Sequence, residues 1–278
     1  MSVVYVDFFQ KAQSIGQLLQ MRARSFPQQI ALRYLPAANE VATTHSLLSL
    51  AGEGARRADE DNLQQSVSIS YAVLHQRAKR MAASLQQIVH SGERAILMYT
   101  CDIDYVCAIF ACVYAGIIAI PALPIQTKKD LKRLKNIIAE TQPRLCLTNE
   151  YGMQSLGGNF WRTACVKNMW PVVIDQVIKE DKIEAPTFQG YQETNSDPED
   201  IVIIDYANSG DNKLVATYLS HRELLEKAQH AARELNLSHA ESVVSILSSF
   251  ANEGLIAGLI SPFYRSCTAV MSELKIAR

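Results

Sequence analysis

The feature that most constrains the fold is a regular alternation of short apolar runs with longer segments of helical periodicity. The predicted strands are Ala95–Tyr99, Ile117–Ile120 and Leu145–Thr148, and the predicted helices run from Ser70 to about His90, from Asp102 or Asp104 to Gly116, and from Lys128 to Thr141. Short strands that alternate with longer helices are typical of largely parallel sheets. The sequence therefore predicts an α/β fold with parallel-rich layered sheets and flanking helices.

The same pattern continues on both sides of this block and indicates two subdomains. The outer elements are a helix from Ile15 to Arg24, capped by Ser14, and strands at Ile30–Tyr34, Val172–Ile174, Ile201–Ile204 and Thr268–Met271. We expect residues 1–190 to form a first α/β subdomain and residues 191–278 to form the start of a second, truncated one. The polar stretch 36–66 is predicted to be a surface insert, either a solvated excursion or a partner-binding loop.

Composition excludes several classes of protein. The formal net charge is -1, so the chain lacks the basic excess that nucleic-acid binding needs. The N-terminus carries Asp7 and has no basic start before an apolar core, so we expect no signal peptide, a cytoplasmic location and reduced thiols. The 6 cysteines form no CxxC pair, which argues against a zinc site. The uncharged run Tyr105–Leu123 is not predicted to span a membrane, because Gly116 and Pro121 interrupt it.

Several short motifs occur in a fixed order along the chain. They are Leu18-Leu19 with Arg22-Ala23, Ile69-Ser70-Tyr71, Gly92-Glu93-Arg94-Ala95, the run from Cys112 to Pro121, and Leu219-Ser220-His221-Arg222-Glu223. Their order resembles the N-terminal part of the adenylate-forming enzymes, most closely the fatty acyl-AMP ligases. The run from Cys112 to Pro121 is similar to the ligases' CLYAGVIAVP motif, and the resemblance covers nearly the whole chain apart from the insert 36–66.

This resemblance implies a fold, an activity and a set of partners. The fold would be the N-terminal portion of the adenylate-forming ligase fold. The family activates a fatty acid with ATP and magnesium: the carboxylate attacks the α-phosphate and gives an acyl-adenylate and pyrophosphate. The acyl group then passes to the phosphopantetheine of an acyl carrier protein. ATP, magnesium, a fatty acid and a carrier protein are thus the implied ligands and partners.

The family's phosphate loop is altered in this chain. In the family, a Ser/Thr/Gly-rich loop that ends in Pro-Lys-Gly lies between two strands. Counted in register from Tyr206, Val215 stands at the lysine position and Ala216 at the following glycine. Asp211 adds a carboxylate where a polyphosphate would bind, and two like unit charges 4 Å apart repel by about 4 kcal/mol at an effective dielectric of 20.

Three residues remain as candidates for holding phosphates. Small residues such as Ser209 and Gly210 let backbone N–H groups close on phosphate oxygens, and Lys213 can supply positive charge. A solvated loop lysine is the alternative for Lys213. We assign no catalytic residue and no metal ligand.

A second family motif is altered as well. The family's His-Asp-Met-Gly reads Ala251-Asn252-Glu253-Gly254, and the alanine can neither hydrogen-bond nor transfer a proton. Full ligases are much longer than this chain, and the remainder would supply the adenine pocket, the magnesium-binding acid and a catalytic lysine. We therefore expect the chain alone not to complete the family's site. Truncation would also leave an exposed apolar surface near Leu255 to Met271.

Two surface features allow a structural and a functional interpretation. Ser220, next to His221, is predicted to be a helix N-cap rather than a nucleophile. The helix from Lys128 carries a basic face that is either simply solvated or a docking site for an acidic carrier protein; it comprises Lys128, Lys129, Lys132, Arg133 and Lys135.

Three functions follow as hypotheses. The first is a fatty acyl-AMP ligase-like protein or fragment, a pseudoenzyme unable to adenylate fatty acids by itself. The second is the N-terminal half of an active ligase that is completed by a companion subunit and passes acyl groups to a carrier protein. The third is a non-enzymatic scaffold of lipid or polyketide synthesis.

Overall fold

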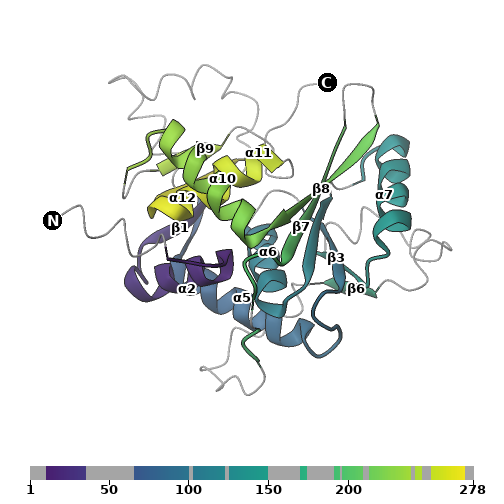
Figure 1. The fold of residues 1–278 in the computed structure, drawn as a ribbon, viewed down its shortest axis with the longest axis horizontal. Helices are drawn as coiled ribbons and strands as arrows, with labels where there is room; N and C mark the ends of the chain where they lie inside the picture. Colours follow the sequence, from purple (N-terminus) through teal and green to yellow (C-terminus); the bar gives the residue numbers. More distant parts are fainter. Residues whose placement is uncertain are drawn as a thin grey trace.

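Two β-sheets and the helices around them make up the part of the chain that the computed structural model describes (Figure 1). The described residues are 11–35, 66–99, 103–122, 125–149, 170–173, 191–194, 196–208, 213–238, 242–245 and 252–272. Apart from Ser66, the predicted insert 36–66 lies outside them.

The larger sheet has 6 strands in the order β6-β5-β3-β4-β7-β8. Its strands are β3 (Arg94–Met98), β4 (Ile118–Ala122), β5 (Leu145–Thr148), β6 (Trp170–Val173), β7 (Ile201–Asn208) and β8 (Leu214–Ser220). All neighbours are parallel except β7 and β8, which form an antiparallel hairpin at one edge. The predicted parallel-rich α/β architecture is confirmed.

The smaller sheet joins strands that are far apart in the sequence. Its order is β2-β1-β10-β9, with β1 (Ile30–Leu35), β2 (Val67–Ser70), β9 (Ser242–Ser245) and β10 (Thr268–Ser272). In it β10 lies parallel to both β1 and β9. Each sheet thus takes strands from both sides of residue 190, so the predicted subdomain boundary does not coincide with a division between the sheets and stays a prediction.

Helices separate the two sheets and cover the outer face of the larger one. They are α2 (Ile15–Ser25), α5 (Tyr71–Leu85), α6 (Ile103–Ala115), α7 (Lys128–Thr141), α10 (His221–Glu234), α11 (Asn252–Leu255), the π-helix η2 (Ile256–Ile260) and α12 (Ser261–Arg265). On one side α6 contacts β3 and β4, and on the other it contacts β1. Because α6 is apolar on all sides, it suits this place between two sheets.

The opposite face of the six-stranded sheet is covered by α7. This helix has the predicted bounds, and it buries Leu134, Ile137 and Ile138 against apolar side chains of β3, β4 and β7. Among the described residues, no helix combines the length and the apolar character that a membrane crossing needs.

The predicted end of α5 is wrong by several residues. The helix stops at Leu85, and residues 86–88 form a turn, so the segment does not continue to His90. As a result Val89 is buried, whereas Ile88, which continues the apolar spacing of the helix, is 51% exposed.

The expected exposed surface near Leu255 to Met271 is also wrong. Leu259, Ile260 and Phe263 are fully buried because η2 and α12 pack against α10, and β10 occupies the interior of its sheet. Arg22, which is buried, donates from Nε to the carbonyl oxygen of Phe263 at 2.7 Å and fixes α2 to the end of α12.

Candidate functional site

The far end of the β7–β8 hairpin lies on the side of the larger sheet where ligands of α/β proteins bind. Since β7 runs parallel to β4, its carboxyl end lies on the same side of the sheet as the carboxyl ends of β3, β4 and β5. Ligands of open α/β sheets bind outside the carboxyl ends of such strands. Asn208 pairs with Leu214 at the end of the hairpin ladder, so the described part of the hairpin ends at these two residues.

The structure describes part of this tip. Ser209, Gly210 and Asp211 lie outside the described residues. Lys213 is exposed immediately before β8, two positions before the place of the family's lysine. That place belongs to Val215, which pairs with Ala207 and is 48% exposed. The described part of the tip therefore presents a hydrocarbon side chain where the resemblance implies an ammonium group.

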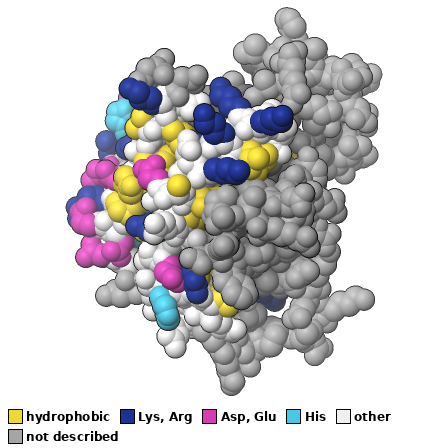
Figure 2. Space-filling model, turned by 90° about the vertical axis from the view of Figure 1, so that its right-hand side faces the viewer, with side chains coloured by type: hydrophobic (Ala, Val, Ile, Leu, Met, Phe, Trp, Pro, Cys, Tyr) yellow, Lys and Arg dark blue, Asp and Glu magenta, His cyan; other side chains and the backbone are white. Residues whose placement is uncertain are grey.

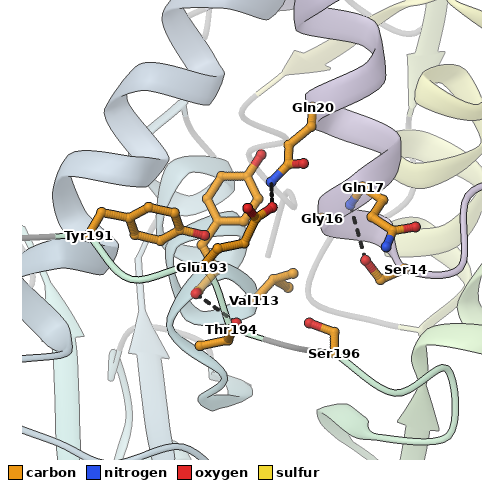
Figure 3. Close-up of a pocket in the computed structure, with 10 residues that line it drawn as sticks. Ser14, Gly16, Gln17, Gln20, Val113, Tyr191, Glu193, Thr194 and Ser196 are labelled. Atoms are coloured by element: carbon orange, nitrogen blue, oxygen red, sulfur yellow. Dashed lines mark hydrogen bonds between the residues drawn. The ribbon is translucent and has the colours of Figure 1, made fainter.

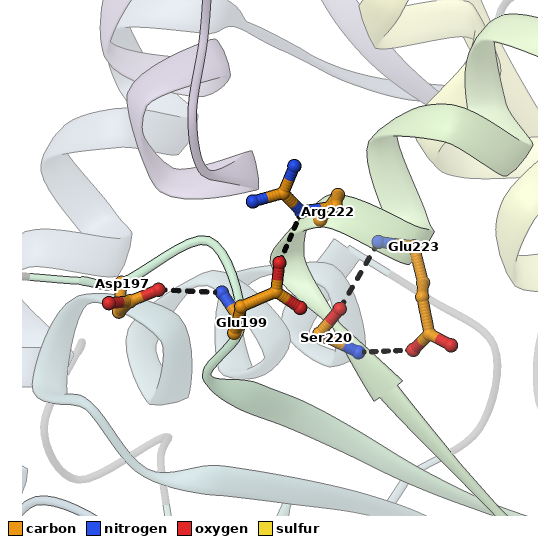
Figure 4. A network of polar contacts seen from close by, with 5 residues as sticks. All are labelled: Asp197, Glu199, Ser220, Arg222 and Glu223. Atoms are coloured by element: carbon orange, nitrogen blue, oxygen red, sulfur yellow. Dashed lines mark hydrogen bonds and ion pairs between the residues drawn. The ribbon is translucent and has the colours of Figure 1, made fainter.

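The other end of the hairpin is rigidly held. Ser220 caps α10: its Oγ accepts from the backbone N–H of Glu223 at 3.2 Å, and its own N–H donates to the Glu223 carboxylate at 2.9 Å (Figure 4). Arg222 forms an ion pair with Glu199, whose N–H donates to the carboxylate of Asp197. The prediction that Ser220 is an N-cap is confirmed.

His221 is a structural histidine. It is 1% exposed, and its Nδ1 accepts from the backbone N–H of Ile15 at 3.4 Å. Burial lowers the pKa of His221 to about 4, although the nearby charge of Asp200 acts in the opposite direction. The neutral ring therefore joins the start of α10 to the start of α2, and the Ser220 hydroxyl is engaged in the cap.

One contact near the tip was not predicted from the sequence, which placed Arg133 on the basic face of α7. The guanidinium of Arg133 on α7 donates to the carbonyl oxygen of Tyr206 on β7, two residues before that strand ends. Arg133 lies one turn before the buried Ile137, so its position on α7 was a signal that it faces the sheet. Its partner could not be predicted, because the two residues are 73 positions apart.

The described cysteines offer no reactive thiol. Cys107, Cys112, Cys146 and Cys267 are free and buried. Burial raises the pKa of Cys112 and of Cys146 to about 12, which keeps both thiols protonated. No group of three or more His, Cys, Asp or Glu residues suited to a metal ion occurs within the described ranges.

A pocket of about 310 Å³ lies between α2, the end of α6 and the segment that precedes β7 (Figure 3). The last two come before the amino ends of β4 and β7, so the pocket lies on the other side of the sheet from the carboxyl ends of the strands. Several of its polar groups bond to one another or to nearby backbone. Gln20 donates to the Glu193 carboxylate at 3.3 Å, and the Thr194 hydroxyl donates to the carbonyl oxygen of Tyr114 at 3.0 Å. The pocket is separate from the hairpin tip. Several polar groups of its lining already have hydrogen-bond partners within the protein.

Sequence comparison gives relatives among fatty-acid-activating enzymes. The family described as AMP-binding enzyme matches residues 50–277. A medium-chain-fatty-acid–[acyl-carrier-protein] ligase from Moorena producens is 27% identical over 202 residues, which are 71% of this chain and 33% of the relative. A long-chain-fatty-acid–AMP ligase from Mycolicibacterium smegmatis is 24% identical over 194 residues, 70% of this chain and 30% of the relative.

A further relative has a name of another kind. Disco-interacting protein 2 homolog B from Homo sapiens is 22% identical over 270 residues, which are 95% of this chain and 15% of that protein. The chain thus spans a third or less of the length of these three relatives.

Structure comparison gives the same fold. The fatty acyl-adenylate ligase of Legionella pneumophila, solved with acyl adenylate and pyrophosphate, matches with a TM-score of 0.76 at 19% identity over 96% of this chain and 41% of that chain. The described elements thus form the N-terminal portion of the adenylate-forming ligase fold. Because the family match covers most of the sequence, the chain belongs to the AMP-binding enzyme family.

Proposed function

We propose that this chain is a fatty acyl-AMP ligase-like AMP-binding module that does not adenylate fatty acids by itself. The observation that carries the proposal is the place of Val215. The hairpin pairs Val215 with Ala207, so the register read from Tyr206 leaves a half-exposed hydrocarbon at the lysine position. A valine side chain supplies neither charge nor a hydrogen bond to a phosphate.

ATP with magnesium is the ligand that the family suggests, and the described residues fit it poorly. Lys213 is the described cation of the loop, and with Ser209 and Gly210 it forms the set that would contact phosphates. The carboxylate of Asp211, in the same short loop, would repel them. The loop therefore offers a bound nucleotide one cation beside one opposing carboxylate.

The direct test is ATP–pyrophosphate exchange with magnesium and a long-chain fatty acid. We expect no exchange above background from the full chain, and turnover would contradict the proposal. In calorimetry, Val215→Lys should raise the affinity for MgATP, because it restores an ammonium group. Thr217→Lys, on the same face of β8, is the matched control and should not. Equal affinities for the wild type and Val215→Lys would also count against the proposal.

A second candidate is the N-terminal part of a working ligase. The ligase from Moorena producens supports it, because its name specifies transfer of a medium-chain fatty acid to an acyl carrier protein. In this case Ser209, Gly210 and Lys213 hold phosphates, and a companion subunit supplies the rest of the site. Exchange activity that appears only when the remainder of a ligase is added would favour this candidate.

A third candidate is a non-enzymatic scaffold. Similarity to Disco-interacting protein 2 homolog B over 95% of this chain favours it, since that name describes an interaction rather than a reaction. Calorimetry that detects no affinity for ATP or for an acyl-adenylate would support the scaffold. We also propose a cytoplasmic location, because the free, buried thiols suit a reducing compartment.

A further inference from the structure

The exposed face of α7 carries an unusual concentration of positive charge. Lys128, Lys129, Lys132 and Lys135 are all exposed, whereas the helix packs on the sheet through Leu134, Ile137 and Ile138. Figure 2 views the side of the molecule on which α7 lies and shows Lys and Arg side chains gathered there. The lysines therefore point away from the core.

The local electrostatics of the helix do not favour this arrangement. The first turn of a helix carries partial positive charge, so Lys128 and Lys129 lie where a cation is destabilising. The nearby carboxylate of Asp130 is engaged in the capping box, where it accepts from the N–H of Thr127 at 2.8 Å. Within the part of the chain that the structure describes, no ion pair joins these four lysines to a carboxylate. Within the described residues, the positive charge of these four lysines is therefore not neutralised by an ion pair.

We propose that the exposed face of α7 docks an acidic helical segment of a partner protein. Lys128, Lys132 and Lys135 recur at helical spacing and lie along one side of α7. A partner helix with carboxylates at the same spacing would place one opposite each ammonium group. This inference needs no nucleotide at the hairpin and is independent of the proposed function.

Other anionic partners suit this face less well. The remaining exposed residues of α7 are Asn136, Ala139 and Glu140, so its exposed face has no large apolar side chain to insert into a bilayer. The net charge of -1 for the whole chain opposes binding to a nucleic-acid backbone. Glu140 adds a negative charge near the C-terminal end of α7, so the positive charge is limited to the first part of the helix.

The position of α7 gives the docking face a functional context. Arg133 bonds α7 to the Tyr206 carbonyl of β7, so a partner bound to the lysines would lie next to the hairpin that carries the family's phosphate loop. Docking there would bring a second protein to the edge of the sheet where ligands of this fold bind.

The test uses the full chain and a fluorescent synthetic helical peptide with glutamates at positions i, i+4 and i+7. In anisotropy titrations at low salt we expect binding that Lys128→Glu/Lys132→Glu weakens by about tenfold or more. The control, Lys227→Glu/Arg233→Glu on the exposed side of α10, makes the same change in net charge and should stay within about twofold of the wild type. Added salt should weaken binding of the wild-type chain.

Several results would overturn the docking proposal. They are the absence of peptide binding, an equal loss in both double variants, and equal binding of a peptide with glutamines in place of the glutamates. Tighter binding to phosphatidylglycerol vesicles or to duplex DNA than to the acidic peptide would assign the face to a membrane or to a nucleic acid. Circular dichroism of each variant confirms that its fold is retained.

Discussion

The two ends of the β7–β8 hairpin differ in what holds them. At the base, Ile201 pairs with Ser220, and Leu219, Ser220 and His221 are almost completely buried. At the tip, Lys213 is exposed and Val215 is half exposed. The base is held by packing and capping, whereas the side chains in the described part of the tip bury little surface. We therefore expect substitutions at the exposed tip to disturb the fold less than substitutions at the base.

The largest expected difference compares one apolar residue from each end. Leu219→Ala removes a side chain that is 1% exposed in the main core and should lower the free energy of unfolding by about 2–5 kcal/mol. Val215→Ala, at the half-exposed tip, should change it by about 0.5 kcal/mol or less. Urea denaturation measures both. Similar losses in the two variants would show that the tip is as tightly packed as the base.

The pH dependence of stability reports on His221 at the base. Its pKa is about 4 in the folded protein against 6.5 for an exposed histidine, so between these values the unfolded chain binds more protons. The stability from the neutral ring is complete above pH 6.5 and is lost as the pH falls through 4, by up to about 3 kcal/mol.

Two histidine variants separate the contribution of His221. His221→Gln should flatten the acid limb of a plot of unfolding free energy against pH. His230→Gln, on the exposed part of the same helix, is the control. Burial and the charge of Lys79 also lower the pKa of His75 to about 4. His75 therefore contributes to the pH dependence of the unfolding free energy in both variants. An unchanged acid limb in His221→Gln would contradict the assignment.

Two glycines test how tightly the chain is packed just before strands β3 and β4. Gly116 and Gly92 both have positive φ, at 71° and 84°, and the N–H of Gly92 donates to the carbonyl oxygen of Gly116. A Cβ on Gly116 would lie 2.5 Å from the Ser91 hydroxyl oxygen, whereas one on Gly92 would meet nothing within 4 Å. We expect Gly92→Ala to cost about 1 kcal/mol from backbone strain, and Gly116→Ala to cost more. Equal costs in thermal denaturation would mean that Ser91 moves aside freely.

The smallest effect concerns the cap at the base. Ser220→Ala removes the side-chain acceptor for the Glu223 N–H and should lower stability by about 1 kcal/mol. Ser220→Asp keeps an acceptor at this position and should restore most of the loss. If Ser220→Ala unfolds at the same urea concentration as the wild type, the capping box does not stabilise the hairpin base.

Local patterns in the sequence predicted the elements that local interactions determine. The bounds of α7 were predicted from its helical periodicity, and the structure adds the capping box of Thr127 and Asp130. Ser220 was identified as a cap from the residues around it. The end of α5 was missed, because Ile88 continues the apolar spacing although the helix has already ended.

Contacts between distant segments could not be predicted from local patterns. The sequence does not show that Arg133 meets the Tyr206 carbonyl or that His221 meets the N–H of Ile15, since periodicity carries no information on which elements become neighbours. At the candidate site, the departure at Val215 followed from the register of the family motif, and the structure added its half-exposed place opposite Ala207.

The strand order of the smaller sheet has a consequence for synthesis of the chain on the ribosome. The Thr268 hydroxyl on β10 donates to the carbonyl oxygen of Ile30 on β1, across 238 positions of sequence. While the chain is being made, β1 emerges early but has no parallel neighbour until β10 has been translated. Closing so long a loop is slow, so the pairing of β1 with β10 belongs to the last steps of folding.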